Sequence, residues 1–144
     1  PPTAAIPREG RVGVRVRYSE CDPMNVVHHA SYIPWLEIGR TEILRGCGVT
    51  YAAMEAAGFF LVIVKLEARY RRPAFYDDLV EVRTRVVGGS RVKIEHEYEV
   101  VVVERGGQAV EIEAVAASST LACVGRDGRP RELPEWLVTR PGGS

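Results

Sequence analysis

The stretch YSECDPMNVVHHASY, residues 18–32, places an aspartate, a proline and two adjacent histidines in one short polar link. Pro23 biases Asp22 toward an extended backbone, which gives the Asp22 carboxylate a defined direction. His28 and His29 come just before an expected helix, whose first amides lack intrahelical acceptors and favour negative charge. A carboxylate that faces such amides, with a carbonyl carbon between them, could carry out acyl transfer.

The chemistry of this link favours a thioester substrate. Helix-start amides polarise a carbonyl and hold its oxyanion, typically worth about 2.7 to 4 kcal/mol per donor. The carboxylate either attacks the carbonyl or activates a water, the latter typically giving roughly 10² to 10⁴ in rate. A thiolate, whose conjugate acid has a pKa of about 8.5, leaves without a strong general acid, whereas an amine or an alkoxide would need one.

Other interpretations of the same residues stay open. Either His29 orients the carbonyl or the water and contributes its amide while His28 faces away, or both histidines are polar turn residues near a helix cap. A metal site made of Asp22, His28 and His29 lacks a third histidine or carboxylate at ligand spacing. Cys21 could be a nucleophile paired with a histidine, but as the neighbour of Asp22 it should point to the opposite side of the chain.

Three further groups, outside the centre of the link, could take part in catalysis or substrate binding. Tyr18 is either a core aromatic with a hydrogen-bonded hydroxyl or a catalytic residue. Glu37 and Arg40, at i and i+3 on a helix, form a common surface pair, but if both are buried they must satisfy each other. A basic cluster at the end of an expected strand consists of Arg69, Arg71 and Arg72. It either binds the phosphates of a carrier such as coenzyme A or is simply a solvated strand end.

One helix and a first strand flank the link. Residues 11–19 alternate and predict a strand with one apolar face, formed by Val12, Val14, Val16 and Tyr18. Residues 31–46 change to a helical period, with Ser31 as the expected cap and Pro34 tolerated in the first turn. The apolar stripe of this helix is predicted to consist of Ile33, Leu36, Ile43 and Leu44.

The rest of the chain predicts a second, weaker helix over 51–58 and four more strands, over 59–72, 79–87, 91–103 and 108–124. Gly88–Gly89 and Gly106–Gly107 are the expected turns. These elements indicate an α+β domain over 1–144, with a curved antiparallel sheet of about five strands around one long helix. The helix backbone is expected to come close to the small residues Ala116, Ala117 and Ser118. Residues 1–10 and 140–144 are expected to be flexible.

The composition limits the binding partners and the cellular location that can be expected. The formal net charge is zero, which gives no sign of a nucleic-acid or anionic-membrane partner. Three widely spaced cysteines suit a reducing compartment and argue against a structural zinc site. No apolar run approaches the roughly 18 residues of a membrane span, so a cytoplasmic location is expected. The run FFLVIV would be costly on an open sheet edge, which predicts that a second copy of the chain covers it.

The run YSECDPMNVVHHASYIPWLEIGRTEILR resembles the 4-hydroxybenzoyl-CoA thioesterase family, especially its YbgC-like acyl-CoA thioesterase branch, in the pattern Y-x-E-x-D, V-V-x-H-A-[NS]-Y and E-x-x-R. The run RYRRPAFYDDLVEVRTRV is similar to a second signature of that family. The resemblance implies a hot-dog fold, a dimer often paired into a tetramer, and no cofactor beyond the coenzyme A of the substrate. It matches Asp22 to the catalytic aspartate, and His29 and Tyr18 to two motif positions. With the active site at the dimer interface and coenzyme A outside it, Arg69, Arg71 and Arg72 become better candidates for binding coenzyme A.

The sequence departs from the family pattern at two places, and both bear on which substrate the protein uses. Met24 and Asn25 stand where many relatives have glycine or another small residue, and His28 replaces a common aromatic residue. The expected function is hydrolysis of an acyl-CoA thioester. The alternative is a hot-dog module that binds acyl-CoA or acyl carrier protein without hydrolysing it. A dehydratase on the same fold fits less well, because that branch carries its histidine and aspartate in a different arrangement.

Overall fold

The computed structural model describes residues 2–3 and 6–138. Its elements follow in chain order: β1 (Glu9–Arg15), η1 (Tyr18–Glu20), η2 (His29–Ser31), α1 (Tyr32–Arg45), α2 (Tyr51–Ala56), β2 (Phe60–Tyr70), β3 (Leu79–Gly89), β4 (Lys93–Arg105), β5 (Gln108–Val124) and η3 (Glu135–Leu137). No helix among these residues is both long and apolar enough to cross a membrane.

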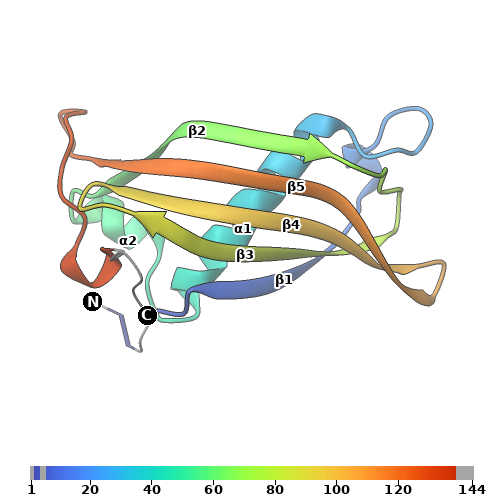
Figure 1. Cartoon of the computed structure of the whole chain (residues 1–144), viewed down its shortest axis with the longest axis horizontal. Coiled ribbons are helices and arrows are strands. Elements are labelled where there is room, and N and C mark those ends of the chain that lie inside the picture. Colours follow the sequence, from blue (N-terminus) through green and yellow to red (C-terminus); the bar gives the residue numbers. More distant parts are fainter. Residues whose placement is uncertain (1, 4–5, 139–144) are drawn as a thin grey trace.

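The strands form one antiparallel sheet in the order β1-β3-β4-β5-β2, and α1 crosses one face of it (Figure 1). A curved antiparallel sheet wrapped around one long helix is the arrangement of the hot-dog fold. The expected α+β class and architecture are therefore confirmed. The start of α1 lies beside the link that contains Asp22, and its other end lies near α2 (Figure 1).

The main core lies between α1 and the inner face of the sheet. Trp35 and Leu36 are each 1% exposed and pack on valines of the middle strands, including Val80, Val82 and Val100. Burying a large apolar side chain typically contributes about 1.5 to 3 kcal/mol, so these residues fix the position of α1 on the sheet. The predicted stripe is right for Leu36, Ile43 and Leu44 and wrong for Ile33, which is 40% exposed.

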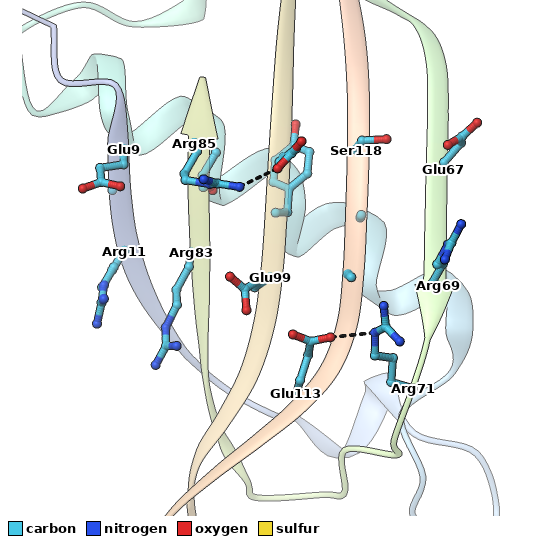
Figure 2. Close-up of a pocket in the computed structure, with 16 residues that line it drawn as sticks. Glu9, Arg11, Glu67, Arg69, Arg71, Arg83, Arg85, Glu99, Glu113 and Ser118 are labelled. Carbon is cyan, nitrogen blue, oxygen red and sulfur yellow. Dashed lines mark hydrogen bonds and ion pairs between the residues drawn. The ribbon is translucent and has the colours of Figure 1, made fainter. Parts of the chain in front are cut away.

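At Gly39, α1 lies directly against β3. A Cβ atom on Gly39 would collide with Thr84 Oγ1 and lie 2.8 Å from Val82 Cγ1, both on β3. The expected approach to the small residues of β5 is therefore wrong. Ser118 lies on the outer face of the sheet (Figure 2), Ala116 lines the same face, and Ala117 packs against the main core.

Three predicted features of the first strand are wrong. β1 begins at Glu9, inside the expected lead-in, and ends at Arg15. Tyr18 starts the η1 turn and is 72% exposed, so it is neither on the apolar face of the strand nor a core aromatic. The strand ends early because the Glu20 N–H donates to Arg17 O, 3.0 Å away, which turns the chain out of the sheet.

The two glycine pairs behave differently. Gly106 and Gly107 form the predicted turn, with φ of 60° and 78°. Gly88 and Gly89 instead stay in β3 and pair with Glu95 and Ile94 after a register shift that follows Val86. The β3–β4 turn therefore falls at residues 90–92.

The edge strand β2 contains most of the apolar run FFLVIV, which was expected to be covered by a second copy of the chain. Val62 and Ile63 are each 41% exposed and Val64 is 55% exposed. β2 pairs with β5 on one side only and is an outer strand of the sheet. An apolar outer strand is a ready surface for pairing with another strand.

A second buried group is polar and lies near the end of α1. Arg40 is 7% exposed and His96, on β4, is 6% exposed. The expected pair of Arg40 with Glu37 is not formed, because Glu37 points outward and is exposed. Burial and the nearby Arg40 charge lower the pKa of His96 to about 4, so His96 is neutral at pH 7.

We expect Gly39→Ala to destabilise the fold by about 1 to 3 kcal/mol, because the added methyl group forces α1 away from β3. Urea unfolding measures the change. Gly46→Ala, at the end of α1, is the matched control, since a Cβ there meets only ordinary contacts, the nearest at 3.5 Å. Equal effects of the two substitutions would contradict the close packing at Gly39.

His96 should make stability depend on pH between 6.5 and 4. Its folded pKa of about 4 lies below the ordinary 6.5, so the unfolded chain binds a proton first as the pH falls. This lowers the free energy of unfolding by about 3 kcal/mol across that range. His96→Phe should flatten the profile, measured by urea unfolding at several pH values, and a change of the exposed His28 to Asn should not. An unchanged slope in His96→Phe would refute this assignment.

Candidate active site

The link between β1 and α1 folds back on itself as a small hairpin. Cys21 and Val27 form an antiparallel bridge, and the Asp22 N–H donates to Val26 O at 2.9 Å. The segments 20–22 and 26–28 therefore lie side by side. This brings the backbone that carries Asp22 next to the backbone that leads into His29.

One oxygen of Asp22 is held by its own loop. Asp22 Oδ1 accepts hydrogen bonds from the N–H groups of Met24, at 2.8 Å, and Val26, at 3.1 Å. Asn25 adopts a φ of 61°, a left-handed conformation that glycine favours and asparagine tolerates. Asp22 Oδ2 has no hydrogen-bond donor within the described part of the chain, so the half-buried carboxylate is oriented with one oxygen available.

His29 opens the η2 turn that leads into α1. Its N–H donates to no acceptor among residues 2–3 and 6–138, as expected for the first amide of a helical segment. Its carbonyl accepts a hydrogen bond from the Tyr70 hydroxyl at 3.1 Å, and the two rings meet edge to face. Both His28 and His29 are exposed, and His29 is tied to β2 through Tyr70.

The Glu20 carboxylate holds the link to the helix, a role that the sequence did not suggest. Glu20 is 7% exposed, and its Oε2 accepts from the Trp35 indole N–H at 2.7 Å. Its Oε1 accepts from the Arg17 N–H at 2.7 Å. Burial acts to raise the pKa of Glu20, but the hydrogen bonds from Arg17 and Trp35 outweigh it and hold the pKa below its usual value. The one sequence signal for Glu20 is its place in the Y-x-E-x-D motif.

Ser31 does not cap α1 as expected. It occupies the cap position, but its side chain makes no cap hydrogen bond. The Ser31 hydroxyl instead donates to Glu20 O at 3.1 Å, and the His28 N–H donates to the same oxygen at 2.9 Å. Both contacts tie the start of the helix to the link.

Tyr18 and Cys21 lie beside the hairpin. The Tyr18 ring packs edge to face on Tyr76, with ring centroids 5.6 Å apart. Burial, followed by the charges of Glu20 and Asp22, raises the pKa of the Cys21 thiol. A raised pKa disfavours the thiolate, which argues against Cys21 as a nucleophile. No cluster of three or more potential metal ligands occurs in the described residues.

The three arginines expected to bind coenzyme A do not all have the same surroundings. Arg69 and Arg71 project from the outer face of the sheet, where Arg71 Nε lies 2.6 Å from Glu113 Oε1 (Figure 2). Tyr70, between them, reaches His29 on the helix side. Arg72 is exposed. The coenzyme A role of all three therefore stays a prediction, and within one chain Arg69 and Arg71 face away from His29.

The family follows from comparison with known proteins. Residues 16–140 match the thioesterase-like superfamily. The chain belongs to this superfamily. It is 30% identical over 128 residues to YneP of Bacillus subtilis, a protein assigned by name to the acyl-CoA thioesterases. The matched residues cover 85% of this chain and 88% of YneP. YbgC of Escherichia coli O6:H1, named an acyl-CoA thioester hydrolase, is 38% identical over 73 residues, which cover 51% of this chain and 54% of YbgC.

Solved structures of thioesterases share the fold. The DHNA-CoA thioesterase of Staphylococcus aureus has a TM-score of 0.77 and 28% identity, covering 90% of this chain and 83% of that one. The 4-hydroxybenzoyl-CoA thioesterase of Pseudomonas sp. strain CBS-3 has a TM-score of 0.79 at 21% identity, with coverage of 91% and 98%, a likeness of fold alone. The family resemblance drawn from the two sequence signatures is confirmed.

Glu20→Gln should destabilise the protein by about 1 to 3 kcal/mol at pH 7, because both carboxylate oxygens accept from N–H groups and an amide would turn its own NH₂ toward one of them. Since the folded pKa is lowered, the contribution of the charged form is present above the ordinary value of 4.5 and disappears as the pH falls through the folded pKa. Urea unfolding at pH 7 and below pH 4.5 tests both parts.

The matched control is Glu67→Gln, because Glu67 on β2 is exposed and pairs with exposed Lys65. A loss of stability in Glu67→Gln as large as that in Glu20→Gln would contradict a special role for Glu20.

Proposed function

We propose that this protein hydrolyses acyl-CoA thioesters to a free acid and coenzyme A. Asp22 acts as general base or nucleophile, and backbone amides at the start of η2, including that of His29, form the oxyanion site. The observation that supports the proposal is the hairpin that holds Asp22 Oδ1 on two loop amides and brings the backbone of Asp22 next to the segment that leads into His29. Membership of the thioesterase-like superfamily supports the class of reaction.

The proposed steps use few groups. The substrate carbonyl takes its place by the His29 amide, which stabilises the negative charge that develops on its oxygen. Asp22 either attacks the carbonyl carbon or removes a proton from an attacking water. The carbon–sulfur bond then breaks and the thiolate of coenzyme A leaves without a strong general acid. Where a water attacked, the free acid forms directly; where Asp22 attacked, a water then hydrolyses the aspartyl–acyl anhydride, which releases the acid and restores the carboxylate. The exposed Tyr18 is proposed to contact the substrate at the rim of the site.

We propose that the active unit is a homodimer, with two dimers pairing into a tetramer. The exposed run Val62–Val64 on the outer strand β2 supports pairing of this strand with a second copy. In such an assembly, Arg69, Arg71 and Arg72 of one chain would approach the other chain. Their proposed role is to bind the phosphates of coenzyme A.

A second candidate function is binding of acyl-CoA or acyl carrier protein without hydrolysis. The observation that favours it is that Asp22 Oδ1 already accepts two loop amides, an arrangement that a purely structural turn would also use. Substrate binding without release of thiol would distinguish this function from catalysis.

Asp22→Asn should lower kcat by at least about 100-fold with little change in KM, because asparagine keeps an oxygen for the Met24 and Val26 amides but cannot act as a base or nucleophile. Release of free thiol from a panel of aliphatic and aromatic acyl-CoAs, followed with a thiol reagent, measures the rate. Asp77→Asn is the control, because Asp77 is exposed in the turn before β3 and has a φ of 68° that asparagine tolerates.

Wild-type turnover on none of the acyl-CoAs, or full activity in Asp22→Asn, would overturn the proposal. Tight binding of acyl-CoA without thiol release, unchanged in Asp22→Asn, would favour the binding module.

A further inference from the structure

A cavity of about 320 Å³ lies at the opposite end of α1 from His29, between the helix end, α2 and the sheet. Its volume is close to the lower limit of ligand pockets, roughly 300 Å³, which suits a short chain or a single ring. Most of the residues that line it are apolar, including Ile43, Leu44, Leu61, Ile94, Trp136 and Leu137.

Two buried polar side chains also line this cavity. Arg40 and His96 are each more than nine-tenths buried, at 7% and 6% exposed. Arg40 Nε and His96 Nδ1 have no hydrogen-bond partner in the described chain. Buried polar atoms are almost always paired, so these two atoms need an explanation.

The charge of the cavity is positive and uncompensated. Among the described residues that line it there is no Asp or Glu, and Arg8 adds a second guanidinium. Arg40 donates a hydrogen bond to the Tyr51 hydroxyl, which is neutral because burial raises the pKa of Tyr51 to about 12. Glu37, the nearest acidic residue before Arg40 on α1, is exposed. A buried cation without an anion is unfavourable, since burial removes its hydration.

We propose that this cavity binds a small apolar carboxylate, a short-chain or single-ring acid, with its carboxylate on the guanidinium of Arg40. The planar guanidinium presents N–H donors in the geometry that a carboxylate accepts. His96 lines the same cavity and, in the tautomer that carries its proton on Nδ1, can supply a second hydrogen-bond donor. The apolar walls take the chain or ring.

The cavity is separate from the proposed thioester site within one chain. Arg40 follows Tyr32 by eight residues of helix, a rise of about 12 Å. The proposal goes beyond the hydrolysis and does not depend on it. A free carboxylic acid is also the chemical class that thioester hydrolysis releases, so an occupied cavity would couple the protein to the level of such acids.

Calorimetric titration of the full chain with sodium hexanoate tests the proposal, with hexanamide as the uncharged probe of similar shape. Hexanoate should bind and hexanamide should bind at least tenfold more weakly. Arg40→Met should weaken hexanoate binding by about 30-fold or more, and its Tm should not fall, because the substitution removes an unpaired buried charge. Arg45→Met is the matched control, since Arg45 is exposed on the next turn of α1 and pairs with Glu42.

Two further variants make the outcome decisive. Leu61→Trp fills the cavity while keeping Arg40, and should abolish binding even if Arg40→Met does not fold. Asp22→Asn should leave hexanoate binding unchanged. Absence of hexanoate binding, equal binding of hexanamide, equal effects of Arg40→Met and Arg45→Met, or loss of binding in Asp22→Asn alone would each overturn the proposal.

Discussion

The buried carboxylate of Glu20 is the group on which the arrangement of the link that contains Asp22 depends. Its two oxygens accept hydrogen bonds from the Trp35 indole and the Arg17 amide, and its backbone oxygen accepts from His28 and Ser31. Trp35 is itself fixed in the core between α1 and the sheet. The position of the Asp22 hairpin is therefore set by the same core that positions the helix, which suits a site that must hold a carboxylate and an amide in register.

The two ends of α1 have opposite electrostatic character. At its start, the His29 amide has no acceptor among the described residues, and the neighbouring link carries the Asp22 carboxylate. Near its end, the buried Arg40 has no carboxylate partner in the described chain, and the neighbouring His96 is neutral at pH 7. Gly39, between the two, lets the helix lie against β3. One helix thus serves a proposed catalytic site and a proposed anion site on either side of its contact with β3 at Gly39.

On the outer face of the sheet, positive and negative side chains lie close to one another. Arginines and glutamates alternate across neighbouring strands. They form pairs such as Arg71–Glu113 (Figure 2), Arg83–Glu111 and Arg85–Glu97. Such exposed pairs contribute only about 0 to 1 kcal/mol each, so they matter more for solubility and assembly than for the fold. The arginines expected to bind phosphate belong partly to this surface, where glutamates already accompany them.

The sequence by itself determined the α+β class, the antiparallel strands, the long helix and the family, because alternation, helical period and the Asp22–His29 motif are local properties of the chain. Strand β5, with the bounds 108–124, shows how well alternation and glycine turns define an element. Only the tertiary structure decided that Tyr18 is exposed, that Ser31 bonds to Glu20 rather than capping α1, and that Arg40 lies buried beside His96. These outcomes depend on which side chains meet across elements distant in the chain, and neither period nor propensity encodes such contacts.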